Sequence, residues 1–158
     1  MTVDAQPARV TRPEYGFVVP MNVYFDDLDS FGMLHNSRYA VLVERAWIGY
    51  WQRRGIGYSR DWTLADDGFG VVRELRISYE SPVDRPGEYA GHIWLEHVGR
   101  TSATCGFRVS SADGTRTHAH GSLVMVHLDR ATLRPTEWSD QVRPLYQQLL
   151  RPEHQASA

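Results

Sequence analysis

The chain has 158 residues, a formal net charge of -2 at pH 7 and a hydrophobic fraction of 42%. This length suits one domain with a substantial core and leaves little room for a second. The slightly acidic balance gives no general attraction to nucleic acid or to an anionic membrane surface. All 17 basic residues are arginines, which excludes lysine as a Schiff-base former or as a general base.

Cys105 is the only cysteine, and a single cysteine excludes an intramolecular disulfide or a metal cage built from cysteines. The first residues are polar and include proline, unlike a secretory signal, and no apolar run reaches the length that crosses a bilayer. We therefore expect a cytoplasmic protein with no membrane partner. Composition predicts a mobile arm over residues 1–14, a single domain over 15–150 and a disordered tail over 151–158.

The first two elements are a strand and a long helix. Apolar residues recur at alternate positions from Phe17 to Phe25, which predicts the strand. From Ser37 to about Arg54 the apolar residues follow helical spacing, with Asn36 or Ser37 as the expected cap at the start. A stripe this wide must be covered by a sheet. Its members are Tyr39, Leu42, Val43, Ala46, Trp47, Tyr50 and Trp51.

A loop, four strands and a short helix are expected after the long helix. Residues 55–69 mix Gly, Ser, Asp and aromatic residues, which favours a loop that could line a cavity entrance. Asp113-Gly114 is typical of a tight hairpin turn, and the strands should run as an antiparallel meander. The expected strands are Val71–Tyr79, Glu88–Val98, Thr101–Ser111 and Thr115–Asp129, and a closing helix should follow Pro135.

Two carboxylates, Asp27 and Asp29, lie between the first strand and the helix. Gly32 allows a sharp turn there, so a carboxylate can face the start of the helix. Such a pairing suits acyl transfer, because the unpaired N–H groups at a helix N-terminus can hold an oxyanion. The alternative for either aspartate is a structural role, in which its side chain caps the turn or the helix.

The whole pattern resembles a known family. Its parts are Tyr24-x-x-Asp27-x-Asp29-x-x-Gly32, Asn36-x-x-Tyr39, Glu44-x-Ala46 and Ile77-x-Tyr79-x-x-Pro82, in this order along the chain. This order and spacing are similar to those of hotdog-fold acyl thioesterases, particularly the branch named after 4-hydroxybenzoyl-CoA thioesterase. The resemblance implies an α+β hotdog fold, with a five-stranded antiparallel sheet wrapped around one long central helix and a short C-terminal helix.

The resemblance also implies roles for individual residues. Asp29 matches the catalytic carboxylate, acting as a general base on water or as a nucleophile on the thioester, while Asp27 is expected to be a solvated turn carboxylate. Asn36 is expected to cap the helix or to donate to substrate, with a backbone N–H near it as the oxyanion donor. His35, Tyr39 and Glu44 are candidate substrate contacts.

Two of these candidates have alternative roles, and the sequence differs from those of related thioesterases at two positions. A turn histidine such as His35 is more often structural, and Glu44 is expected to pair with an arginine unless a neighbouring subunit places it near the site. The chain has Met33 where related acyl-carrier-protein thioesterases commonly have histidine. It has Asn36 where the 4-hydroxybenzoyl branch has an aromatic residue.

The resulting expectation is an acyl thioesterase that acts on acyl-CoA or an acyl carrier protein, with a fatty, aromatic or polyketide-type acyl group. The resemblance implies homodimers or homotetramers with the site between subunits. We expect no cofactor and no metal, although His118-x-His120 places two imidazoles on one strand face. The alternatives are a hotdog hydratase or dehydratase and a non-catalytic acyl-ligand binding module.

Overall fold

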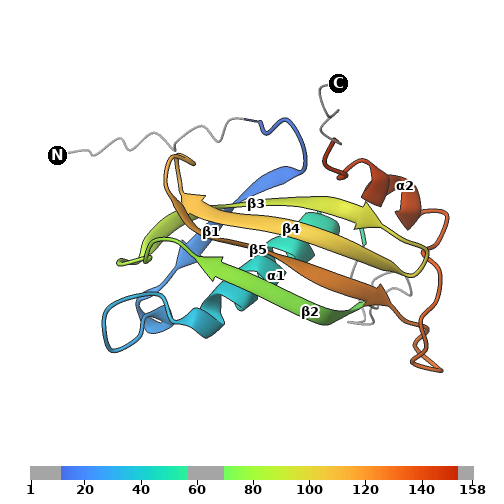
Figure 1. Cartoon of the computed structure of the whole chain (residues 1–158), viewed down its shortest axis with the longest axis horizontal. Coiled ribbons are helices and arrows are strands. Elements are labelled where there is room, and N and C mark those ends of the chain that lie inside the picture. Colours follow the sequence, from blue (N-terminus) through green and yellow to red (C-terminus); the bar gives the residue numbers. More distant parts are fainter. Residues whose placement is uncertain (1–11, 57–69, 153–158) are drawn as a thin grey trace, which may run out of the picture.

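The computed structural model describes residues 12–56 and 70–152. Five strands and one long helix form most of it, and a short helix follows the last strand (Figure 1). The elements are β1 (Phe17–Val23), the 3-10 turn η1 (Phe25–Asp27), α1 (Asn36–Gln52), β2 (Gly70–Tyr79), β3 (Gly87–Val98), β4 (Ser102–Ser111), β5 (Thr117–His127) and α2 (Val142–Gln147). Most of the expected N-terminal arm, cavity-entrance loop and C-terminal tail lies outside the described residues.

The sheet is antiparallel throughout and has the strand order β1-β3-β4-β5-β2. The expected meander is correct for β3, β4 and β5 but wrong for β2, which pairs with β5 at the far edge. Short turns keep β3, β4 and β5 adjacent, and β1 occupies the other side of β3. Of the two edges that remain, the outer side of β1 and the free side of β5, β2 pairs at β5.

Helix α1 packs across the concave face of the sheet (Figure 1). All seven residues of its predicted apolar stripe are buried, which confirms the helical spacing as a core signal. The Phe17 ring of β1 stacks on Tyr50 with ring centroids 3.8 Å apart. The helix ends where Gly55 adopts a φ of +75°, a left-handed conformation that glycine adopts without strain. The expected α+β architecture is thus confirmed.

The C-terminal segment covers one end of the sheet. In α2, Val142 and Tyr146 are buried, and the Tyr146 ring meets Trp138 edge-on at 4.6 Å between centroids. Leu95 of β3 donates its N–H to the Leu149 carbonyl at 2.8 Å, so the chain after α2 is joined to the sheet. In the part of the chain that the structure describes, no helix has both the length and the apolar character to cross a membrane.

Candidate active site

A pocket of about 340 Å³ opens where the start of α1 meets the end of β2. We call it the Asp29 pocket. It brings together four predicted site residues, Asp29, His35, Asn36 and Tyr39, but does not include Glu44. The remaining lining residues are Met33 and Leu34 before the helix, and Tyr79, Glu80, Ser81 and Pro82 at the end of β2.

The half-buried carboxylate of Asp29 organises its own loop. Its Oδ1 atom accepts hydrogen bonds from the backbone N–H of Phe31 at 2.8 Å and of Met33 at 3.1 Å. The Asp29 N–H donates to the Met33 carbonyl at 2.7 Å, and Gly32 closes the loop with a φ of +74°. No described residue donates a hydrogen bond to Oδ2. One oxygen of Asp29 is therefore held in place while the other is available to a ligand.

Asp27 has a different environment and lies outside the Asp29 pocket. It is 6% exposed, so the expectation of a solvated carboxylate is wrong. The expected bonding to local backbone is correct, because Oδ2 accepts from the Tyr24 N–H at 2.9 Å. Its Oδ1 lies 3.5 Å from Nε of Arg38 in the first turn of α1. This pairing explains the burial: the carboxylate has a cation and a backbone donor in place of water.

His35 caps α1, so the expected cap at Asn36 or Ser37 is wrong. His35 has extended backbone angles, and its Nδ1 accepts from the Ser37 N–H at 3.2 Å. Asn36 is the first helical residue, and its Oδ1 also accepts from the Ser37 N–H, at 3.0 Å. Imidazole is not among the preferred N-capping groups, so N-cap preferences favoured Asn36 or Ser37 over His35.

The backbone N–H of Asn36 has no acceptor among the residues that the structure describes. It is the first amide of α1 and lies at the positive end of the helix dipole. Because Asn36 lines the Asp29 pocket, a free amide and a carboxylate belong to the same cavity. This combination can hold a developing oxyanion beside a base or nucleophile.

Two tyrosines complete one side of the Asp29 pocket. Tyr39 is buried, and burial raises the pKa of its phenol above the ordinary value. Its ring meets Tyr79 edge-on, with centroids 5.1 Å apart. The Tyr79 hydroxyl donates to the Asn36 carbonyl at 3.4 Å across 43 positions of sequence. Tyr79 was part of the sequence pattern, but only the fold places it at the helix start.

Glu44 is exposed on the outer face of α1. No described arginine pairs with it, so the expected ion pair is wrong. The reason is geometric: the buried neighbours Leu42, Val43, Ala46 and Trp47 face the sheet, and Glu44 lies on the opposite side of the helix. Within one chain, Glu44 is therefore not a contact of the Asp29 pocket.

The two strand histidines also differ in environment. His118 is buried, with Nδ1 3.1 Å from the Ser81 carbonyl and 3.0 Å from that of Pro82. His120 is exposed and pairs with Glu80 of the pocket rim at 2.7 Å. Across residues 12–56 and 70–152, no three candidate metal ligands lie together. The histidines therefore tie β5 to the segment after β2.

Comparisons with known proteins identify the family of this chain. The model of the family described as the thioesterase-like superfamily matches residues 23–145. A thioesterase of Thermus thermophilus, solved with coenzyme A and zinc, is 28% identical with a TM-score of 0.67, and the match covers 82% of this chain and 96% of that one. A search of curated proteins gave no match.

Two further solved structures show the same fold at lower identity. The PA5185 protein of Pseudomonas aeruginosa strain PAO1 has a TM-score of 0.76 at 22% identity, with 87% of this chain and 94% of that chain covered. The DHNA-CoA thioesterase of Staphylococcus aureus has a TM-score of 0.68 at 18% identity, with 82% and 85% covered. The arrangement of sheet and helix is therefore the hotdog fold expected from the sequence.

Proposed function

We propose that this chain, which belongs to the thioesterase-like superfamily and is a thioester hydrolase, uses the Asp29 carboxylate to hydrolyse an acyl-CoA or acyl-carrier-protein thioester. The observation that carries the proposal is that Asp29 and Asn36 line the same pocket, while Asp29 Oδ2 and the Asn36 N–H have no protein partner in the described chain. A carboxylate and an oxyanion donor suffice because a thioester is already a reactive acyl donor.

In this mechanism the thioester carbonyl oxygen points toward the Asn36 N–H at the start of α1. Asp29 Oδ2 takes a proton from water, whose oxygen attacks the carbonyl carbon, or Oδ2 attacks that carbon itself. In the first route the carbon–sulfur bond breaks, the thiolate leaves with the proton that Asp29 took from water, and the products are a free acid and a thiol. In the second route the break leaves the acyl group on Asp29 as a mixed anhydride, and a water molecule then hydrolyses this anhydride, releasing the free acid, restoring the carboxylate and supplying the proton of the thiol. The positive end of α1 stabilises the negative charge that develops on the carbonyl oxygen.

Two observations support the proposed substrate: the coenzyme A found with one relative, and the apolar residues in and beside the Asp29 pocket. The relative from Thermus thermophilus was solved with coenzyme A, which supports coenzyme A as one carrier. Phe31, in the loop that Asp29 organises, is 83% exposed, and Met33 lines the pocket. These apolar side chains suit a fatty, aromatic or polyketide-type acyl group, with or without a β-substituent, on coenzyme A or a carrier protein.

We also propose a homodimer or homotetramer that completes the site. Strand β2 is an edge strand and exposes Val71, Val72, Leu75 and Tyr79, of which Val72 is 53% exposed. A long apolar edge is a template for pairing with a second copy. Tyr79 belongs both to this edge and to the Asp29 pocket, so a partner on β2 lies beside the pocket. In such an assembly Glu44 of another subunit could reach the substrate.

Free-thiol release from a panel of short, long and aromatic acyl-CoAs tests the role of Asp29. Asp29→Asn keeps the oxygen that accepts from Phe31 and Met33 but removes the negative charge, so the loop should stay folded. We expect release to fall about a hundredfold or more. Asp26→Asn is the matched control, since Asp26 is an exposed neighbour outside the pocket and should keep native activity.

Equal release by native protein and Asp29→Asn would remove Asp29 from the mechanism. If native protein releases no thiol from any acyl-CoA, acyl-carrier-protein substrates are tested next. A changed double bond without thiol release would identify a hydratase or dehydratase. Ligand binding without any reaction, indifferent to Asp29→Asn, would identify an acyl-binding module.

A further inference from the structure

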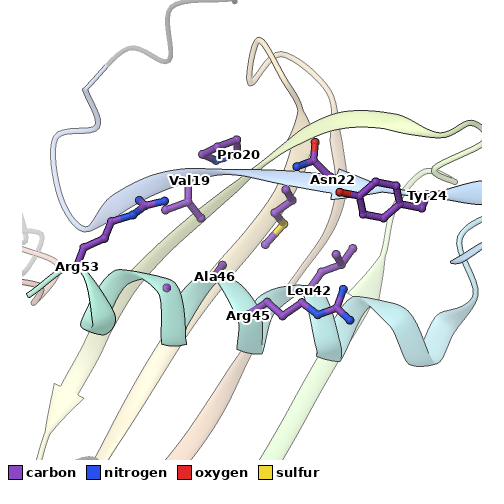
Figure 2. Close-up of a pocket in the computed structure, with 10 residues that line it drawn as sticks. Val19, Pro20, Asn22, Tyr24, Leu42, Arg45, Ala46 and Arg53 are labelled. Atoms are coloured by element: carbon purple, nitrogen blue, oxygen red, sulfur yellow. The ribbon is translucent and has the colours of Figure 1, made fainter. Parts of the chain in front are cut away.

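A second cavity, of about 200 Å³, lies between β1 and α1 (Figure 2). We call it the β1–α1 groove. It shares no lining residue with the Asp29 pocket. Leu42 and Arg45 of α1 lie toward one end of the groove, Val19 and Arg53 lie at the other, and the Asn22 side chain lies on the side of β1 away from α1 (Figure 2). Met21 also lines the groove and is buried. The groove is therefore apolar along its length and polar at its ends.

The charges of the β1–α1 groove are all positive. Arg45 and Arg53 line it, and no aspartate or glutamate does. Neither guanidinium has an ion-pair or hydrogen-bond partner in the described parts of the chain. Arg53 follows Arg45 by eight positions, which is about 12 Å along the helix axis. The two arginines are therefore free to bind a negatively charged group that enters the groove.

Gly49 lies on α1 between the two arginines. A Cβ atom at this position would meet nothing within 4 Å, so no packing contact within the described chain requires a glycine there. Glycine inside a helix costs roughly 0.5 to 1 kcal/mol relative to alanine. The physical effect of Gly49 is to leave the middle of the β1–α1 groove open, because any longer side chain would fill it.

The outer edge of β1 disfavours a peptide strand as occupant. Pro20 lies in the middle of β1, lines the groove and has no backbone N–H. A peptide strand added at this edge would lack a hydrogen-bond donor opposite its centre. Proline commonly protects edge strands in this way. The occupant is therefore recognised through side chains. A volume of 200 Å³ holds on the order of seven water-sized groups, which fits a single narrow chain.

We infer that the β1–α1 groove binds a single-chain carboxylate of medium length, with its head on Arg45 and its chain along α1. The guanidinium of Arg45, which projects from α1 beside the groove, can hold the carboxylate through paired hydrogen bonds (Figure 2). The hydrocarbon passes Met21 and Gly49 toward Val19, where the alkyl stem of Arg53 covers its end.

This site depends on the groove alone. Its relation to the reaction rests on the proposed function: hydrolysis of a fatty thioester releases a carboxylate of the class that the groove accepts. Binding there places a product outside the Asp29 pocket, because the groove is lined by later residues of α1, from Leu42 onward, whereas the pocket is lined by Asn36 and Tyr39 at its start. The two ideas can fail separately, because octanoate binding is measured without any thioester.

Isothermal titration calorimetry of the full chain with octanoate tests the site, with hexanoate and decanoate as length variants and octyltrimethylammonium as the same chain without an anion. We expect octanoate to bind and octyltrimethylammonium not to bind. Arg45→Gln should weaken octanoate binding about ten- to a hundredfold, since it removes a charge-assisted hydrogen bond. Arg134→Gln, on an exposed turn outside the groove, should leave the affinity unchanged.

Two substitutions of Gly49 distinguish binding in the β1–α1 groove from binding in the Asp29 pocket. Gly49→Leu fills the groove and should abolish octanoate binding, whereas Gly49→Ala adds a Cβ into open space and should keep it. Asp29→Asn should also keep it. The inference is overturned if native protein binds no octanoate, if Gly49→Leu binds as well as Gly49→Ala, or if the cationic chain binds equally. Circular dichroism confirms that each variant is folded.

Discussion

Nε of Arg38 lies 3.5 Å from Oδ1 of the buried Asp27, which joins the first turn of α1 to the 3-10 turn η1. The other carboxylate oxygen of Asp27 holds the Tyr24 N–H at the end of β1. Asp27 thereby sets the path of the chain just before the loop that Asp29 organises. Asp27 therefore stabilises the junction between β1 and α1, whereas Asp29 lines the Asp29 pocket.

Asp27→Ala should lower the free energy of unfolding by about 1 to 3 kcal/mol, because it leaves the Tyr24 N–H and Arg38 without their acceptor. Urea unfolding measures this change. Arg38→Gln should cost less, since the Tyr24 N–H keeps its acceptor and the Arg38 side chain is 40% exposed, so water can take the place of the guanidinium. A double-mutant cycle isolates the pair. Strictly additive effects of the two substitutions would show that the pair contributes nothing.

His35→Ala should destabilise the protein by about 1 kcal/mol, the usual cost of losing an N-cap. The side chain accepts from the Ser37 N–H, and alanine cannot. His35→Asn should restore most of the stability, because asparagine is a preferred cap. Thermal melts of the three proteins measure the order. If His35→Asn is as unstable as His35→Ala, the imidazole stabilises α1 by another route.

Cys105 should be unreactive toward alkylating reagents in the folded protein. It is fully buried in β4, and desolvation raises the pKa of its thiol well above the usual range. The unfolded thiol ionises above about pH 8.5, so the unfolded state gains stability there while the folded thiol stays neutral. The free energy of unfolding should therefore fall as the pH rises from about 8.5. Cys105→Ala should flatten this slope, and an equal slope in both proteins would contradict the assignment.

His92 should make the protein less stable in mild acid. Burial lowers the pKa of its imidazole, and Nε2 lies 2.8 Å from the Tyr15 carbonyl, so the neutral ring donates this hydrogen bond. The unfolded histidine takes up a proton below about pH 6.5, where the folded one resists it, so stability falls as the pH drops through this range. Chemical unfolding of His92→Gln, which keeps a donor but does not titrate, should show a weaker acid dependence. An unchanged dependence would assign the effect to other groups.

Local patterns predicted much of the fold. The apolar stripe of α1 and the Asp113-Gly114 turn depend on spacing over a few positions, and each has a direct structural counterpart. The candidate site residues came from the family resemblance, and four of the five line one pocket. The Gly114 φ of +76° is the positive angle that this turn requires. Glu44 shows the limit of such local patterns. Helical spacing predicts which face of α1 carries Glu44, but it does not predict whether an arginine lies close enough to pair with it.

By itself the sequence determined the helix, the strands and the carboxylate before the helix start, because these follow from the chemistry of neighbouring residues. The tertiary structure alone decided that β2 lies at the far edge, that His35 caps α1 and that Tyr79 meets Asn36. It also decided that Arg45 and Arg53 face an apolar groove under β1. Apart from the cap, which joins His35 to Ser37 two residues later, these outcomes depend on segments far apart in the chain, whose contact is set by the packing of the whole core.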